Sequence, residues 1–364
     1  MGRLSAAIGR LIAALCEPDA GQGQIYIDDI LMVIRGDLDT RASMVSLVLY
    51  TLKALGVLIS LRKGERGEQI RWIGVNVNLE WTNSEFEAKK LVYAVPKPMI
   101  CEVKEALVRW KDKGMIPLRD LRTITGKLSW IAGIVVRMRW AVSVLYAVVA
   151  SMEEDIRLRA EDHRAEKRED DRKKPQLVAV KRFEVARQWL IEVMMDPDRM
   201  LIRTEPLTET DIEWVVVCDA CPMGYGAVLA KKTANRGHLH PVEAFEAKFT
   251  EAEAKLLMVQ WGEASSQGTL EALALWRSIK VWATKLQGKG ILMRSDSAVA
   301  LSMAEKYTSG SLSLNFLGGE LALLAEKLNL PKLRTQHLAG KLNQEADWLS
   351  RSHDLIVTRF HQKL

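Results

Sequence analysis

The fold of this chain is decided at residues 214–229, which read WVVVCDACPMGYGAVL. A run of apolar, β-branched residues ends in Asp219, and two glycines suit a tight turn into a second apolar run. The arrangement recurs at residues 291–297, ILMRSDS, where another apolar run ends in Asp296. Two apolar strands that each end in an aspartate predict a mixed α/β domain in the C-terminal half of the chain.

A third acidic element lies near the C-terminus. Residues 337–351, HLAGKLNQEADWLSR, open with a loop at His337 and close on a helix that carries Asp347. Carboxylates that converge from separate elements can hold two divalent ions about 3.5–4 Å apart, as two-ion phosphodiester hydrolysis requires. Taken singly, an aspartate after a strand is commonly a turn or cap residue, and a lone histidine is commonly a loop or core residue. The order of these elements favours the metal site.

A second acidic pair lies in the N-terminal half. Residues 24–34, QIYIDDILMVI, predict a β-hairpin with Asp28 and Asp29 at its turn. Adjacent carboxylates beside a core need a cation, and Mg²⁺ prefers carboxylate oxygens. For the dipeptide alone, an ordinary turn remains the simpler interpretation.

The context of this pair changes that interpretation. Tyr26, Asp28 and Asp29 stand in YIDD, which resembles the Tyr-x-Asp-Asp box of reverse transcriptases. Lys63 follows in a glycine-rich turn, and Trp72 with Gly74 resembles the primer-grip hairpin of that family. Residues 119–130 resemble the thumb of gypsy-like and DIRS-like retrotransposon polymerases.

The C-terminal half resembles the ribonuclease H that follows the polymerase in retroelements. The resemblance implies that Asp219, Asp296 and Asp347 are three of four metal ligands. It also implies that His337 and Asn343 belong to the mobile loop before the last aspartate, with the histidine assisting proton transfer or product release. We expect Asn343, together with Trp72 and Gly74, to contact nucleic acid.

The fourth ligand of that family is a helical glutamate between the first two aspartates. Glu271, in GTLEALALW at residues 268–276, is our choice because it precedes Asp296 by a helix and a strand. Glu251 and Glu253 are the alternatives, and the long stretch before Glu271 keeps them open.

The resemblance predicts an α/β (α+β) chain of four parts. They are a partial reverse transcriptase palm at 1–95, a thumb-like helical region at 96–151, a charged connector and helix at 152–204, and a ribonuclease H-like mixed sheet at 205–355. Polymerases of this family use another aspartate on a strand upstream of the hairpin, in a segment that also carries the fingers, and nothing precedes Met1 to supply either. We therefore expect a truncated polymerase with little or no polymerase activity.

Two functions follow. The first is hydrolysis of RNA in RNA/DNA hybrids by the C-terminal domain with Mg²⁺ or Mn²⁺. The second is a non-catalytic nucleic-acid-binding remnant of the same fold.

The net charge of +6 on 364 residues permits a polyanionic partner without demanding one. Four scattered cysteines fit a reducing compartment, and no apolar run is long enough to span a membrane. We expect an intracellular protein, in the cytoplasm or the nucleus, while its oligomeric state is left open.

Local patterns add four expectations. Residues 40–55 predict a helix capped by Asp39, and residues 57–61 and 69–79 predict two strands around a turn at 63–67. Residues 98–150 read as helical with a break at Pro117. Cys218 and Cys221 form a Cys-x-x-Cys, but without a second pair they favour small buried residues over a zinc site.

Overall fold

The computed structural model describes residues 2–16, 21–26, 28–81, 88–162, 176–206, 212–233, 238–260, 263–351 and 356–359. The chain divides into two compact units: unit 1 is Met1–Pro96 with Ile202–Leu207, and unit 2 is Lys97–Leu201 with Thr208–Leu364. Both contain helices and strands, which confirms the predicted mixed α/β class. No helix in the described part of the chain is long and apolar enough to cross a bilayer.

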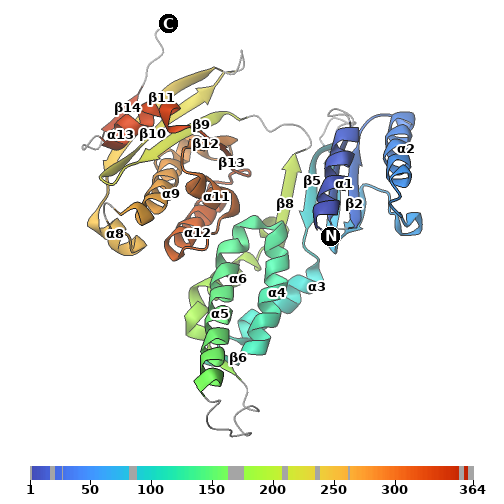
Figure 1. The fold of residues 1–364 in the computed structure, drawn as a ribbon, viewed down its shortest axis with the longest axis horizontal. Coiled ribbons are helices and arrows are strands. Elements are labelled where there is room, and N and C mark those ends of the chain that lie inside the picture. Colours follow the sequence, from blue (N-terminus) through green and yellow to red (C-terminus); the bar gives the residue numbers. More distant parts are fainter. Residues whose placement is uncertain are drawn as a thin grey trace. The chain divides into compact units, whose positions relative to one another are not determined.

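Unit 1 contains a β-hairpin and a four-stranded sheet (Figure 1). Asp28 lies in the turn of the hairpin, as predicted, and the hairpin packs on two helices through a small core of Ile12, Cys16, Met44, Val48 and Leu52. The elements are α1 (Gly2–Leu15), β1 (Gly21–Tyr26), β2 (Asp29–Ile34), α2 (Leu38–Ala54), β3 (Gln69–Trp72), β4 (Val75–Trp81), β5 (Ala88–Ala94) and β8 (Ile202–Pro206). The sheet order is β3-β4-β5-β8.

The predicted helix at 40–55 is present as α2, but its cap is Asp37 rather than Asp39. The Asp37 carboxylate accepts a hydrogen bond from the backbone N–H of Thr40 at 2.8 Å, and the Asp37 backbone is extended. Asp39 already lies in the first helical turn. Both aspartates satisfy the compositional preference for a cap, so composition alone does not choose between them.

The predicted turn at 63–67 and the predicted strand at 57–61 are wrong, and the predicted strand at 69–79 is divided into the two strands β3 and β4. Residues 61–63 form a short 3₁₀ helix, and the chain instead reverses between β3 and β4 at Ile73 and Gly74. Both residues have positive φ, +44° and +86°. A two-residue hairpin turn demands this conformation, which glycine adopts freely and a β-branched isoleucine adopts only with strain.

The first part of unit 2 is mainly helical, as predicted for residues 98–150, and Pro117 marks the predicted break. Its elements are α3 (Lys97–Arg109), β6 (Met115–Pro117), α4 (Leu118–Ile134), α5 (Arg139–Asp162), β7 (Leu177–Ala179), α6 (Glu184–Val193) and α7 (Pro197–Met200). Of the charged connector, residues 163–175 lie outside the described residues.

The second part of unit 2 is built on a six-stranded mixed sheet of order β13-β12-β9-β10-β11-β14. Strands β9, β10 and β11 are antiparallel, whereas β9, β12 and β13 run parallel. The elements are β9 (Trp214–Ala220), β10 (Gly224–Lys232), β11 (Leu239–Lys248), α8 (Glu251–Leu257), α9 (Ala264–Val281), α10 (Ala283–Leu286), β12 (Ile291–Ser295), α11 (Ala298–Lys306), α12 (Leu312–Lys327), β13 (Arg334–His337), α13 (Gln344–Arg351) and β14 (Ile356–Arg359).

Helices cover both faces of this sheet (Figure 1). Val216 and Cys218 of β9 are fully buried in the core that α9, α11 and α12 complete. Asp219 is the next residue along β9, so its side chain points to the opposite face, where α13 lies. Strand β9 therefore packs apolar side chains against α9, α11 and α12, while the Asp219 carboxylate contacts α13.

The glycines after Asp219 do not form the predicted tight turn. Gly224 and Gly226 lie inside β10, where α13 packs directly on the strand. A Cβ on Gly226 would lie 2.4 Å from the Cβ of Leu349 and 2.9 Å from the backbone N of Ser350. Glycine is needed here for close approach of a helix to the sheet.

We predict that Gly226→Ala lowers the free energy of unfolding of unit 2 by about 1–3 kcal/mol, because the added methyl group must push α13 away. Gly126→Ala is the matched control: Gly126 lies in α4 with no atom within 4 Å of the added Cβ. That change should stabilise the protein by about 0.5–1 kcal/mol. Urea unfolding followed by circular dichroism measures both. An unchanged midpoint for Gly226→Ala would contradict the described packing of α13.

Candidate functional site

Two parallel strands bring Asp219 and Asp296 together. Asp219 is the sixth residue of β9, and Asp296 directly follows β12. The register pairs Arg294 with Val217, so Asp296 lies level with Asp219, each two residues further on. Ordinary parallel pairing of β9 with β12 therefore brings together two aspartates that are far apart in the sequence.

Glu271 completes a group of three carboxylates, which we call the acid triad. One oxygen from each of Asp219, Glu271 and Asp296 lies within 4.8 Å of the others. Asp219 and Glu271 are buried, with 6% and 4% of their surface exposed, whereas Asp296 is more open. The protein therefore covers Asp219 and Glu271, and solvent reaches the acid triad at Asp296.

The Glu271 side chain is only half satisfied by protein donors. The amide Nε2 of Gln267, one turn earlier on α9, donates to Glu271 Oε1 at 2.9 Å and to the carbonyl oxygen of Ala220 at 2.6 Å. Glu271 Oε2 is buried and forms no hydrogen bond of normal geometry with the described residues, although a backbone contact from Ala220 lowers the pKa of Glu271 against the effect of burial. A buried carboxylate oxygen left in this way is costly unless a cation or a proton meets it.

Burial and mutual repulsion raise the pKa values of the acid triad. Burial raises the pKa of Glu271 to about 8, with a smaller contribution from the charge of Asp219. Burial also raises the pKa of Asp219 to about 6, against the lowering effect of the Ser350 hydrogen bond. Near neutral pH Glu271 therefore holds a proton unless a positive charge is supplied, whereas Asp219 is largely ionised and takes up its proton at a lower pH.

The loop and helix after β13 fix the position of Asp219. Asn343 is 1% exposed, and its Nδ2 donates to Asp219 Oδ1 at 3.2 Å and to the carbonyl oxygen of Cys218 at 3.3 Å. The Ser350 hydroxyl donates to Asp219 Oδ2 at 2.9 Å. It also lies 2.8 Å from the carbonyl oxygen of Asp347, and its single proton serves one acceptor at a time.

Asn343 therefore acts through Asp219 in this structure. The predicted contact between this residue and nucleic acid stays a prediction, and in this structure the Asn343 side chain is buried. Its Oδ1 is also buried and has no partner among the described residues.

Asp347 lies outside the acid triad. Its carboxylate is bound by Arg351, one turn later on α13, with Nη2 at 2.7 Å from Oδ1 and Nε at 3.0 Å from both oxygens. Asp347 is nevertheless close enough to raise the pKa of Asp219 by its charge. It borders the site without joining the three clustered oxygens.

His337 and the following loop lie beside Asp296. His337 is the last residue of β13, is exposed, and places Nε2 3.0 Å from the backbone carbonyl oxygen of Asp296. A Cβ on Gly340 would lie 3.0 Å from Asp296 Oδ2, so the loop approaches this carboxylate closely. The predicted loop thus lies at the open side of the acid triad.

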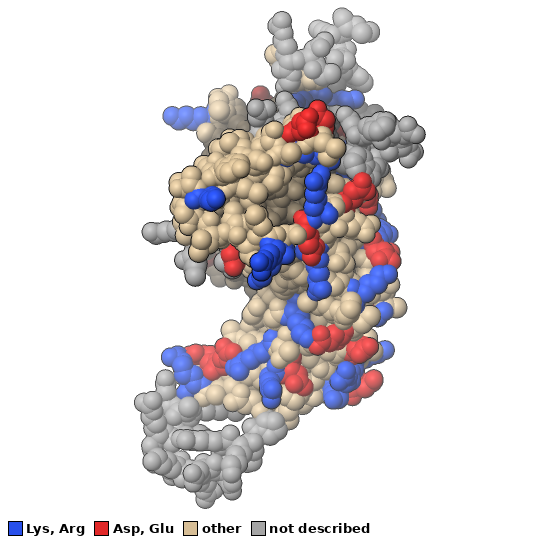
Figure 2. Space-filling model, turned by 90° about the vertical axis from the view of Figure 1, so that its right-hand side faces the viewer, with Lys and Arg blue, Asp and Glu red and all other residues tan. Residues whose placement is uncertain are grey.

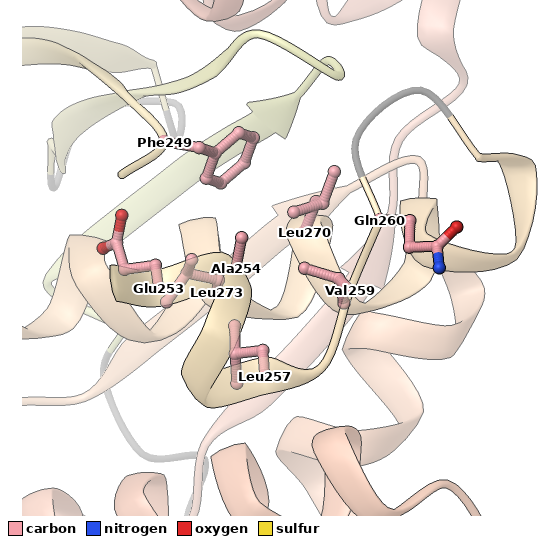
Figure 3. Close-up of a pocket in the computed structure, with 8 residues that line it drawn as sticks. All are labelled: Phe249, Glu253, Ala254, Leu257, Val259, Gln260, Leu270 and Leu273. Atoms are coloured by element: carbon pink, nitrogen blue, oxygen red, sulfur yellow. The ribbon is translucent and has the colours of Figure 1, made fainter. Parts of the chain in front are cut away.

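The alternative glutamates have other roles. Glu253 forms a capping box with Thr250 at the start of α8 and an ion pair with Arg277. It also lines a small pocket between α8 and α9 with mainly apolar side chains, including Leu257, Val259 and Leu270 (Figure 3). Glu251 is exposed on α8. The structure brings neither residue to the two aspartates.

The Cys-x-x-Cys does not form a thiol pair. Cys218 is fully buried on the core face, with Sγ 3.7 Å from the carbonyl oxygen of Arg294, and burial raises its pKa well above the usual value. Cys221 Sγ lies 3.0 Å from the carbonyl oxygen of Ser350. Both cysteines are free thiols.

The polymerase-like residues lie in unit 1. Tyr26, Asp28 and Asp29 are exposed at the tip of the β1–β2 hairpin. The indole N–H of Trp72 donates to the carbonyl oxygen of Asp29 at 3.4 Å, and Gly74 forms the turn after Trp72. Lys63 ends the short 3₁₀ helix. Among the described residues, the acid triad is the cluster of metal-binding side chains that the structure assembles, and the hairpin aspartates are not part of such a cluster.

Sequence reasoning missed three residues that shape the site: Gln267, Ser350 and Arg351. Ser350 and Arg351 follow Asp347 by three and four residues on a helix, and Gln267 precedes Glu271 by four. A spacing of three or four residues places both members of each pair on one face of a helix. This spacing was the signal in the sequence that could have identified the three residues.

Comparisons with known proteins agree with this geometry in the second half of the chain. Residues 210–315 match a family model described as the RNase H-like domain found in reverse transcriptase. No curated protein sequence matches the chain.

Solved structures show more distant similarity. An RNase H1 isolated from compost by a metagenomic approach is 18% identical over 38% of this chain and 93% of its own, with a TM-score of 0.28. The same RNase H1 in complex with an RNA/DNA hybrid is 18% identical over 37% and 92%, also at 0.28. A foamy viral protease-reverse transcriptase in complex with double-stranded DNA is 13% identical over 92% of this chain, with a TM-score of 0.35. This chain covers 48% of that viral protein.

We predict that stability without divalent ions falls as pH rises. The folded pKa values of Glu271 and Asp219 exceed their unfolded values, so the folded state binds more protons between pH about 4 and about 8. Their contribution is complete below the unfolded pKa values and is lost as pH rises to about 8. Glu271→Gln should remove much of this loss, making the variant more stable than the parent at pH 8 by roughly 1–4 kcal/mol.

Urea unfolding in EDTA at pH 5.5 and pH 8 measures this effect. The exposed Glu251 supplies the control, since Glu251→Gln should keep the parental pH dependence. A parent with equal stability at both pH values would refute the raised pKa of Glu271.

Proposed function

We propose that this protein derives from a retroelement of the gypsy-like or DIRS-like kind and that unit 2 hydrolyses the RNA strand of RNA/DNA hybrids. The single observation that carries this proposal is the acid triad, which three separate elements build at the end of the parallel strands. The family match over residues 210–315 supports the same assignment.

The acid triad fits a divalent ion. It offers three carboxylates, one buried oxygen on Glu271 that forms no hydrogen bond of normal geometry with the described residues, and raised pKa values that a positive charge would lower. Oxygen ligands of this kind suit Mg²⁺ or Mn²⁺. Asp219, Glu271 and Asp296 would hold the first ion, and Asp347 is the proposed fourth ligand. When bound, such ions stabilise charge on the attacking and leaving oxygens of a phosphodiester.

The residues around the acid triad have distinct tasks in this proposal. Asn343 and Ser350 hold the two oxygens of Asp219, and Gln267 holds one oxygen of Glu271, so the carboxylates keep their positions before substrate arrives. His337 is exposed beside Asp296 and would carry a proton to or from the cleaved phosphodiester.

Binding of the hybrid would rest mainly on its phosphates. On the face shown in Figure 2, Lys and Arg side chains are interspersed with Asp and Glu side chains. Contacts of individual Lys and Arg side chains with phosphates would be independent of sequence and sensitive to salt. We propose that the hairpin of Trp72 and Gly74 and the helix α4 help to hold the duplex, while Asp28 and Asp29 add no nucleotides.

One observation favours the non-catalytic alternative. Asp347 is engaged by Arg351, so the fourth carboxylate is not gathered with the other three. A protein that kept this arrangement would bind hybrids without cutting them.

The test is cleavage of a labelled RNA/DNA hybrid by the purified chain with Mg²⁺ or Mn²⁺. We predict that the parent cleaves the RNA strand and that Asp296→Asn lowers the rate by at least about 100-fold, because a ligand of the proposed ion is lost. Glu251→Gln is the matched control and should retain the parental rate. Equal binding by parent and Asp296→Asn, with no cleavage by either, would overturn the catalytic proposal and support the alternative.

A further inference from the structure

The contact between Asp347 and Arg351 differs from the other contacts of the site. Asn343, Ser350 and Gln267 bind the acid triad with neutral groups, whereas Arg351 brings a full positive charge. Its planar guanidinium meets both carboxylate oxygens of Asp347, the geometry in which arginine binds carboxylates most strongly. Asp347 is paired with Arg351 in this way and does not join the three clustered oxygens.

The charge of Arg351 reaches beyond Asp347. It lowers the pKa of Asp219, while Asp347 and Asp219 both raise the pKa of Arg351, Asp347 most strongly. The guanidinium therefore lies in the same electrostatic field as the acid triad. At the edge of the site, the Arg351 guanidinium thus provides part of the positive charge that a second divalent ion would provide.

We propose that Arg351 is a positioning residue that holds Asp347 outside the acid triad and is displaced when a second divalent ion binds. This inference rests on the proposed function, because it assigns Asp347 to the second ion. Arg351 then sets how readily that ion binds, without touching the substrate.

The contact is weak enough to exchange. The side chains of Arg351 and Asp347 are 66% and 42% exposed, so solvent screens the attraction between their charges. Both residues lie on α13, so a change of side-chain rotamer is sufficient and the helix can stay on β10. Arginine in the last turn of a helix is also favoured by the helix dipole, which keeps the displaced side chain tolerable.

Calorimetric titration of the full chain with Mn²⁺ tests the proposal. The parent should bind two ions, and Asp347→Asn should lose the weaker one. Arg351→Met removes the competing charge and keeps the aliphatic stem, so it should tighten the weaker site by about 3- to 10-fold. The stronger site should change by less than about twofold, since the acid triad is untouched. Arg351→Lys keeps the charge and loses the planar fork, so its weaker site should lie between the parent and Arg351→Met.

A second readout uses the unmodified protein. The Nε–H of Arg351 is hydrogen-bonded to Asp347, so its ¹⁵N–¹H resonance should show slow exchange with water in EDTA and faster exchange at saturating Mg²⁺. A purely structural ion pair would keep its protection at all Mg²⁺ concentrations.

The outcomes separate the two proposals. If the parent binds two ions and cleaves the hybrid, but Arg351→Met binds the second ion no more tightly and the Nε–H stays protected, this inference fails alone. If the parent neither binds Mn²⁺ nor cleaves, the proposed function fails and this inference fails with it.

Discussion

The cost of crowding three carboxylates into one largely buried place governs the functional half of this protein. Asp219, Glu271 and Asp296 repel one another, and Asp219 and Glu271 are also poorly solvated, so the folded chain either takes up protons there or binds a cation. The surrounding neutral donors lower this cost without removing it. Stability and metal binding are therefore coupled at a single point of the fold.

The sheet and one helix make this crowding possible. Parallel pairing of β9 with β12 sets the two aspartates side by side, and the glycines of β10 let α13 approach closely enough for Ser350 to reach Asp219. Gly226, the register partner of Asp219 on β10, thus allows the close packing that brings α13 to this aspartate. The helix also carries Asp347 and Arg351, so the charge balance at the edge of the site depends on the same close packing.

Much of this arrangement could be predicted from the sequence, because strand endings and helix periodicity are local patterns. The two aspartates at strand ends and the hairpin at Asp28 needed only order and spacing, whereas the choice of Glu271 over Glu253 also needed the resemblance to ribonuclease H. The turn at Ile73 could not be predicted, since no propensity favours isoleucine at positive φ. The role of Gly226 was also hidden, because it depends on a helix more than a hundred residues later in the chain. The engagement of Asp347 by Arg351 depends on side-chain rotamers, which sequence patterns do not encode.

The last described strand, β14, has a practical consequence. It pairs antiparallel with β11 and covers backbone groups of that strand that would otherwise be open to another chain. Since β13 precedes α13 and β14 follows it, the short helix is anchored to the same sheet at both ends. Trimming the carboxyl-terminal residues, or fusing a bulky affinity tag to them, would free one anchor and expose a sheet edge. An amino-terminal tag is the safer choice for producing this protein.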